Sequence, residues 1–187
     1  MRAVGLRVRS GVALCVVIEG SSESWRVVES RAVRLSPEGD GFARFPFHPL
    51  VELGGPAGIA ASRKAVSAVR ITARRQMAKL LADVGAVNGA GIVAGSLLDP
   101  ERIGSPHMQA HAREGQLFRE VVASGLKHAR TRFEVLSDRD LVARLADRLR
   151  TSVADVNRLL TQAGRGTFRP WAAHQKLAAA GALWSLP

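Results

Sequence analysis

The first 35 residues constrain the fold of this chain more than any later segment, because they divide into three extended stretches joined by short turns. Residues 3–9 alternate apolar side chains with glycine and arginine, and residues 12–19 are apolar almost throughout. Such an apolar run is typical of a strand covered on both faces of its sheet. Residues 25–35 alternate again. The short links between these stretches favour an antiparallel meander of three strands.

The rest of the chain alternates helical and extended segments. We expect further strands at residues 91–95 and 131–136. Helical periodicity and capping residues predict helices at residues 59–84, 106–124, 139–150, 152–163 and 170–184. With no internal repeat and no linker, this order predicts a single α/β domain over residues 1–187. Its mixed five-stranded sheet should contain three antiparallel strands followed by parallel strands, with helices flanking it.

Several of these boundaries depend on single residues. Pro106 should open the second helix behind a Ser105 cap, and Gly125 should end it. Ser152 and Asp155 should form a capping box at the start of a later helix. Alternation in the third strand places four side chains on one face: Trp25, Val27, Val33 and Leu35.

The loop expected at residues 36–58 contains three phenylalanines, Phe42, Phe45 and Phe47. Their rings either pin this loop onto the domain or stack on bases. The glycine-rich run at residues 54–58 lacks the Gly-Lys-Ser/Thr of a phosphate-binding loop, so it predicts no such site.

The helix predicted at residues 59–84 has two contrasting faces. Its apolar stripe consists of Ile59, Val66, Val69, Ala73, Met77, Leu80 and Val84. The opposite half carries Arg63, Lys64, Arg70, Arg74, Arg75 and Lys79. Asp83 is the only acid in this helix. Solubility alone does not require such an excess, so this half is a candidate surface for phosphate contacts.

The charge of the whole chain points the same way. Its formal net charge is +11 and its pI about 11.5, which favours a polyanionic partner such as DNA or RNA. Only four of the 27 basic residues are lysines. A GC-rich coding sequence is therefore an alternative source of the arginines, although it does not explain the shortage of acids.

Cysteine content and hydropathy exclude several classes. Cys15 is the only cysteine, so the chain has no intramolecular disulfide and no cysteine-rich metal site. We expect a buried, inert thiol. The apolar run at residues 12–18 is short and lacks a small-residue cleavage site, so we expect a cytoplasmic protein. No segment approaches the roughly 18 uninterrupted apolar residues of a spanning helix, so no membrane partner is expected.

The first strand and its turn, residues 5–11, read GLRVRSG. This residue pattern and the order of elements resemble the RuvC/YqgF branch of the RNase H-like fold, whose first strand reads Gly-Ile/Leu-Asp-Pro-Gly-Ser. The resemblance implies an RNase H-like sheet. Members of that family hydrolyse phosphodiesters with two divalent ions, which three or four carboxylates hold at one end of the sheet.

The family's carboxylates are replaced in this sequence. Arg7 takes the place of the first acid, and the strand at residues 91–95 ends without the second. The last helix here is similar in sequence to the last helix of the family. This match puts Ala172 and Gln175 in the positions of the family's two remaining acids, beside His174. Arg7 and Lys176 would place positive charge where two cations should bind. The resemblance therefore implies a domain without the nuclease site and without a cofactor.

Other residue patterns offer alternative chemistry. His107, His111 and Glu114 share one helical face and are candidate zinc or iron ligands. The other interpretation is a buried histidine bonded to Glu114 or to a backbone carbonyl. Further ligands would have to come from His48, His128 or His174. No Gly-x-Ser-x-Gly elbow is present, so a serine nucleophile is not expected.

Two segments near the end of the chain also have two interpretations. Asp138 and Asp140 either cap a helix or bind a cation together. The basic, aromatic segment at residues 164–171 either follows a phosphate backbone or simply connects two helices.

We therefore predict a non-catalytic RNase H-like domain that binds nucleic acid. The candidate contacts are Arg7, Arg9, Arg63, Lys64, Arg70, Arg74, Arg75, Lys79, Arg165, Arg169 and Lys176. One alternative is an enzyme, either a nuclease with relocated acids at Asp99, Glu114 and Asp138 or a hydrolase built on His107, His111 and Glu114. The other alternative is a structural subunit or homodimer that acts through a protein partner.

Overall fold

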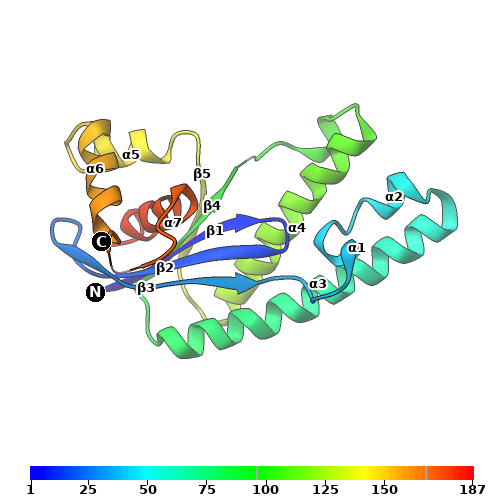
Figure 1. Cartoon of the computed structure of the whole chain (residues 1–187), viewed down its shortest axis with the longest axis horizontal. Coiled ribbons are helices and arrows are strands. Elements are labelled where there is room, and N and C mark those ends of the chain that lie inside the picture. Colours follow the sequence, from blue (N-terminus) through cyan, green and yellow to red (C-terminus); the bar gives the residue numbers. More distant parts are fainter. Residues whose placement is uncertain (96, 167) are drawn as a thin grey trace.

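The computed structural model describes residues 1–95, 97–166 and 168–187, and its centre is a five-stranded sheet with the order β3-β2-β1-β4-β5 (Figure 1). The strands β1 (Arg2–Arg9), β2 (Val12–Gly20) and β3 (Trp25–Arg34) form an antiparallel meander. The strands β4 (Gly89–Ala94) and β5 (Phe133–Ser137) add in parallel beside β1. The mixed sheet predicted from the sequence is confirmed.

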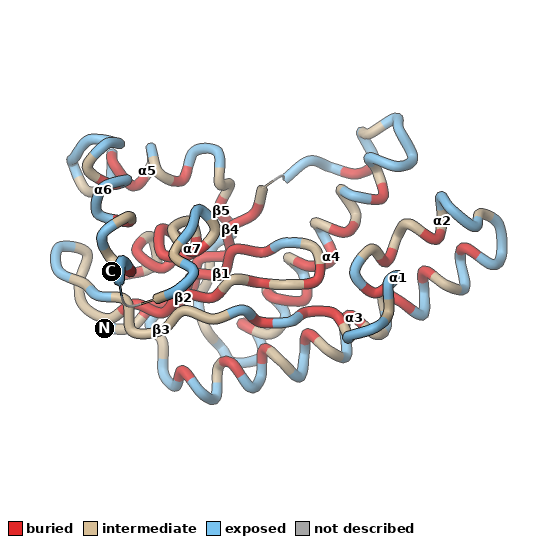
Figure 2. The backbone as a smooth tube through the Cα atoms, viewed as in Figure 1, coloured by how far each residue is buried: buried red, intermediate tan, exposed pale blue. Residues whose placement is uncertain are grey.

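Helices cover both faces of this sheet. The long helices α3 (Gly55–Val84) and α4 (Pro106–His128) lie on one face, and α5 (Leu141–Arg148), α6 (Val153–Ala163) and α7 (Ala173–Trp184) lie on the other (Figure 1). Buried residues concentrate in the sheet and on the inward sides of the helices (Figure 2). The sheet therefore separates two apolar cores, one beneath α3 and α4 and one beneath α5, α6 and α7.

Small residues let α7 lie directly on β1 and β4. A Cβ atom added at Gly5 would stand 1.7 Å from the backbone oxygen of Ala178, and one added at Gly91 would stand 2.2 Å from that of Gly181. Side chains at these positions would push the helix away. The alanine-rich sequence of α7 thus matches glycines in the strands beneath it, and this contact fixes the helix along β1.

A β-bulge in β3 makes one prediction about its faces wrong. The pairing shifts between Val17 and Ile18 of β2, so that Val27 and Glu29 oppose neighbouring residues. The extra residue reverses the alternation. As a result Trp25 and Val27 pack in the α7 core, whereas Val33 and Leu35 pack in the α3–α4 core. The four side chains do not share one face.

Two predictions about the long helices also require correction. Helix α3 begins at Gly55, and Ile59 is exposed, whereas its neighbour Gly58 is buried against Pro49 of α2. Helix α4 does not end at Gly125 but continues to His128. A Cβ atom at Gly125 would stand 2.6 Å from Cβ of Met77, so this glycine permits close contact between α3 and α4 and does not cap the helix.

Other boundaries differ by a few residues. The expected loop at residues 36–58 contains two short helices, α1 (Gly41–Arg44) and α2 (Pro49–Glu52), and a 3₁₀ turn, η1, spans Pro100–Arg102. Helix α5 starts at Leu141 and not at Arg139, and α7 starts at Ala173 and not at Pro170. The Ser105–Pro106 start of α4 is confirmed, although Ser105 makes no side-chain cap bond. Ser152 caps α6, because its hydroxyl accepts from the Asp155 N–H at 3.1 Å; the Asp155 carboxylate bonds to that hydroxyl at 2.6 Å and does not complete the predicted capping box.

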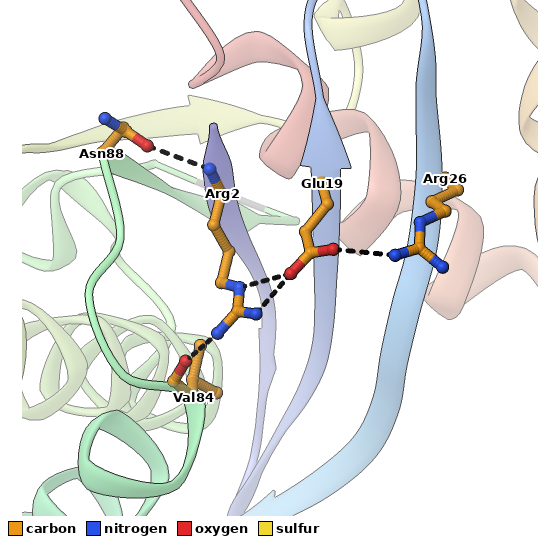
Figure 3. Close-up of polar contacts among 5 residues, drawn as sticks. All are labelled: Arg2, Glu19, Arg26, Val84 and Asn88. Carbon is orange, nitrogen blue, oxygen red and sulfur yellow. Dashed lines mark hydrogen bonds and ion pairs between the residues drawn. The ribbon is translucent and has the colours of Figure 1, made fainter.

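A polar cluster fastens the amino-terminal end of the sheet (Figure 3). The carboxylate of Glu19 pairs with Arg2 and, at 3.1 Å, with Arg26. Arg2 also donates to the Val84 carbonyl at the end of α3, and its backbone N–H donates to Asn88 at 2.9 Å. The hydrogen bond from Arg2 is the main reason why the pKa of Glu19 is lowered. This cluster joins β1, β2, β3 and the end of α3.

Two further expectations concern burial and hydropathy. Cys15 is buried in β2, and burial raises the pKa of its thiol to about 12, as expected for an inert residue. Among the helices of the described residues, none combines the length and apolar character needed to cross a bilayer.

Candidate nucleic-acid interface

A basic cleft of about 240 Å³ opens where β1 and β4 end, against the side of α4. Three arginines line it, Arg7 and Arg9 from β1 and Arg119 from α4. The remaining wall is mostly small or apolar and includes Ala94, Gly95, Leu98, Ala112, Gly115 and Phe118. The carboxyl ends of parallel strands are the usual place for ligands in an open α/β sheet.

Arg7 is almost fully buried at the base of this cleft. Its Nη2 atom lies 2.6 Å from Oδ2 of Asp138, and Nη1 donates to the carbonyls of Val8 at 3.0 Å and Val93 at 3.4 Å. Burial lowers the pKa of Arg7, Asp138 opposes that shift, and Arg9 adds to it. An arginine nevertheless keeps its charge at neutral pH. The pair leaves Arg7 fixed in place with its charge partly neutralised.

Asp138 has a different role from the two that its sequence position suggested. Its carboxylate pairs with Arg7 and does not cap α5. Asp140 is the residue at the start of α5, and its side chain makes no cap bond. Gly95 at the end of β4 leaves room for the pair, because a Cβ atom there would stand 3.2 Å from Arg7 Nη2 and 3.5 Å from Asp138 Oδ2.

Arg119 is a cleft residue that sequence reasoning missed. His111, Gly115 and Arg119 follow one another at intervals of four along α4, so they share the helical face that lines the cleft. A Cβ atom at Gly115 would stand 3.4 Å from Arg119 Nη1, which places the guanidinium over the glycine. Burial lowers the pKa of Arg119. The position of Arg119 two intervals of four after His111 was the signal in the sequence that could have placed it on the same helical face.

The first turn of α7 lies beside the cleft. Burial lowers the pKa of His174, and the charges of Arg9 and Arg7 lower it further while Asp138 opposes them. The Nδ1 atom of His174 is buried without a hydrogen bond to described residues. Gln175 is buried and accepts a bond from the Ala172 N–H at 3.3 Å.

Lys176 does not reach the cleft, contrary to the idea that it would add charge beside Arg7. Its Nζ atom donates to the Thr161 hydroxyl of α6 at 3.0 Å. The turn of the α7 helix between His174 and Lys176 directs the two side chains to different neighbours.

The other basic candidates lie away from the cleft. The six basic residues of α3 are all exposed on its outward half, and Lys79 pairs with Asp83 at 2.9 Å. Helix α3 covers the sheet face opposite α7 (Figure 1). Arg165 and Arg169 are exposed before α7, and Thr167 between them is outside the described residues. The structure thus separates the candidates into a cleft set, an α3 set and a loop set.

Three histidines come together between the loop and α4. His48 precedes α2, His107 is in the first turn of α4, and His111 is one turn further along. One nitrogen from each lies within 4.8 Å of the others. Glu114 is buried beneath them, and its Oε1 atom lies 2.7 Å from His48 Nδ1. The histidine bonded to Glu114 is therefore His48, while His107 and His111 are exposed.

The acids suggested as relocated nuclease ligands do not meet. Asp99 accepts a bond from the Glu101 N–H at 3.0 Å and caps η1, Glu114 holds His48, and Asp138 holds Arg7. Within residues 1–95, 97–166 and 168–187, the one group of three possible ligands able to hold a metal ion is the histidine group.

Comparisons with known proteins support the fold. No family model and no curated protein matches the chain. Two solved structures are similar to it. The first is Thermus thermophilus RuvC, with a TM-score of 0.58 and 12% sequence identity; the match covers 98% of this chain and 91% of that chain. The second is T. thermophilus RuvC in complex with a Holliday junction substrate, with a TM-score of 0.62 and 11% identity; this match covers 98% of this chain and 90% of that chain. The chain therefore has the RNase H-like fold of RuvC.

Proposed function

We propose that this protein is a non-catalytic RNase H-like domain that binds nucleic acid through the basic cleft at the carboxyl ends of β1 and β4. The observation that carries the proposal is the convergence of Arg7, Arg9 and Arg119 in that cleft. Arginine side chains are among the groups that commonly bind nucleic-acid phosphates. A RuvC structure of the same fold is a complex with a Holliday junction.

The composition of the cleft favours binding over hydrolysis. A two-metal nuclease needs several carboxylates around its ions. Here Arg7 occupies the place in the first strand where the RuvC/YqgF family has its first acid. Asp138 is already paired with that arginine. A fixed guanidinium repels a divalent cation most strongly where water is excluded, so the cleft is better suited to a phosphate group.

The three arginines have different roles in this proposal. Arg9 is exposed at the rim and Arg119 is half-buried in the wall, so both can reach a phosphate. Arg7 is held by Asp138 and contributes mainly to the positive potential of the cleft. The exposed basic half of α3 and the loop residues Arg165 and Arg169 supply a second, more peripheral set of phosphate contacts. Lys176 is not in this set, because Thr161 holds it.

Binding of short single- and double-stranded DNA and RNA over a salt series tests the proposal. We expect affinity to fall steeply with salt, and R9Q and R119Q each to weaken binding and reduce the salt slope by about one. The control is R26Q. It removes the same charge from an exposed arginine at the other end of the sheet, and it should change the slope little.

Three results would contradict the proposal. Absence of salt-dependent binding to all four nucleic acids would remove the function itself. Equal losses in R9Q and R26Q would assign the binding to net charge and not to the cleft. Mg²⁺-dependent cleavage of any of these substrates by the wild-type protein would show that the domain is catalytic.

A further inference from the structure

The histidine group lies outside the carboxyl edge of β1 and β4 that the proposed function uses, although His111 also lines the cleft. The rings of His48, His107 and His111 stand around a common point. Their centroids are 4.6–5.1 Å apart, and each pair of rings is steeply inclined, at 69–86°. Three separate imidazoles stacked for packing alone would not need their nitrogens to converge.

The acid beneath the group determines which nitrogens are available. Glu114 Oε1 accepts from Nδ1 of His48 at 2.7 Å and from the Phe47 N–H at 3.3 Å. Its Oε2 atom lies 3.4 Å from Nδ1 of His111. Both histidines therefore turn Nδ1 toward the carboxylate. This arrangement leaves Nε2 of each as the ring nitrogen that does not face Glu114, and Nε2 of His111 lies within hydrogen-bond distance of Nε2 of His107.

The distance between two of these nitrogens fits a shared ion. Nε2 of His107 and Nε2 of His111 are 3.2 Å apart. Two ligands at about 2.05 Å from a tetrahedral zinc ion are separated by about 3.3 Å. The i, i+4 spacing of the two residues on α4 produces this separation, and His48 brings a ring nitrogen from the loop to within 4.8 Å of theirs.

The burial of Glu114 points in the same direction. Its side chain is 1% exposed, and its Oε2 atom is buried without a hydrogen bond to the described residues. A buried carboxylate is costly unless it is compensated. In metal sites a carboxylate commonly accepts the second ring N–H of a ligating histidine, and so fixes the tautomer and the orientation of the ring. Glu114 is placed to do this for His48 and for His111.

We infer that His48, His107 and His111 bind one divalent transition-metal ion of the zinc class through their Nε2 atoms, with Glu114 as the positioning residue. Three imidazoles with a fourth position open suit Zn²⁺, Co²⁺ or Ni²⁺ and not Mg²⁺, which prefers oxygen ligands. The ion would join the loop that carries α1 and α2 to α4, beside the cleft.

The test is titration of the full-length, tag-free, chelator-treated protein with Co²⁺, followed by its visible absorption, and with Zn²⁺, followed by calorimetry. We expect one equivalent of each ion to bind, and Zn²⁺ to displace Co²⁺. Mg²⁺ should not compete. Because the ion binds the folded chain, Zn²⁺ should also raise the melting temperature of the wild-type protein.

Variants assign the ligands. H107A removes an exposed side chain, so we expect it to fold normally and to lose at least tenfold in Co²⁺ affinity. H128A is the matched control, because it removes an exposed histidine from the other end of the same helix, and it should bind as the wild type does. E114Q should bind 10–100-fold more weakly. If E114Q fails to fold, the comparison of H107A with H128A still decides the question.

The inference is overturned if the wild-type protein binds none of Zn²⁺, Co²⁺ or Ni²⁺ stoichiometrically, or if H107A binds as tightly as H128A. Either result is independent of nucleic-acid binding, so failure of this site would leave the proposed function unaffected.

Discussion

At the scale of single residues, the pair of Arg7 and Asp138 determines the character of the cleft. The two side chains are only 10% and 20% exposed, and they come from residues 131 positions apart in the chain. Removing one partner of such a pair leaves the other charge buried without compensation. The pair therefore stabilises the carboxyl edge of the sheet only while both members are present.

We expect D138N to lower the free energy of unfolding by about 3 kcal/mol, the lower end of the range for buried pairs. D140N is the matched control, since it makes the same change two residues later where the side chain forms no cap bond. It should change stability by less than about 0.5 kcal/mol. Chemical denaturation measures both, and similar losses in the two variants would contradict a special role for Asp138.

His174 reports the electrostatic potential of the cleft. Burial is the main cause of its lowered pKa, and the charges of Arg9 and Arg7 contribute further. R9Q should therefore raise the pKa of His174 toward the ordinary value of about 6.5, whereas R26Q at the far end should not. NMR titration of the imidazole measures this, and an unchanged pKa in R9Q would show that the Arg9 charge does not reach it.

The same shift has a consequence for stability at acid pH. Because the pKa of His174 is lower in the folded protein than in the unfolded chain, the unfolded chain binds the proton first as pH falls. The stabilisation is complete above about pH 6.5 and is lost progressively as pH falls through the folded-state pKa. In H174Q this part of the pH dependence of unfolding should be absent.

At the scale of elements, the contact of α7 with β1 and β4 depends on the absence of side chains in the strands. A Cβ atom at Gly91 would meet backbone atoms of Gly181, which cannot rotate away. Helix α7 also contributes several buried residues to the core on its side of the sheet, including Ala178, Ala182 and Leu183. A small shift of α7 therefore disturbs the whole layer.

G91A should destabilise the protein by about 1–3 kcal/mol or more, the usual cost of overpacking. G115A is the control within a helix, because the nearest atom to its added Cβ is the flexible tip of Arg119 at 3.4 Å. It should be neutral or stabilising by up to about 1 kcal/mol, since alanine favours a helix more than glycine does. Thermal unfolding compares them, and equal stability of G91A and the wild type would be inconsistent with the close contact.

Across the whole molecule, the basic candidates are divided into the cleft, the α3 surface and the loop before α7. The cleft arginines lie at the carboxyl edge of the sheet, and the basic half of α3 faces solvent away from the sheet. The net charge of +11 attracts a polyanion from any direction. Only contacts at short range remain effective when salt screens the field, because the Debye length is about 8 Å at physiological ionic strength.

We therefore expect charge reversal of Arg70, Arg74 and Arg75 to weaken nucleic-acid binding strongly at low salt, and the difference from the wild type to shrink as salt rises. The loss caused by R9Q should be smaller at low salt and should shrink less as salt rises, because R9Q removes only one phosphate contact. Affinities measured at low and near-physiological salt distinguish the contribution of α3 from that of the cleft. If the α3 variant lost affinity equally at both, α3 and not the cleft would be the primary contact.

Local patterns in the sequence were enough to predict the order of the strands and the longer helices, because hydrophobic periodicity and capping residues act within a few positions of the chain. They also predicted the mixed sheet, since short links impose the meander. These local signals located the start of α4 and the Ser152 cap of α6. They failed at the third strand, where one inserted residue reverses the faces, and at Gly125, where the glycine serves the packing of another helix.

Which polar residues meet depends on tertiary packing and could not be predicted from the sequence. His48 and His107 are 59 positions apart, yet their ring centroids lie 5.1 Å from each other, and Arg7 meets an acid at the end of a distant strand. The sequence indicated a basic surface but could not divide it into a cleft and an outer helix face. The physical reason is that periodicity sets which face of an element a residue occupies, whereas packing of whole elements sets which faces come into contact.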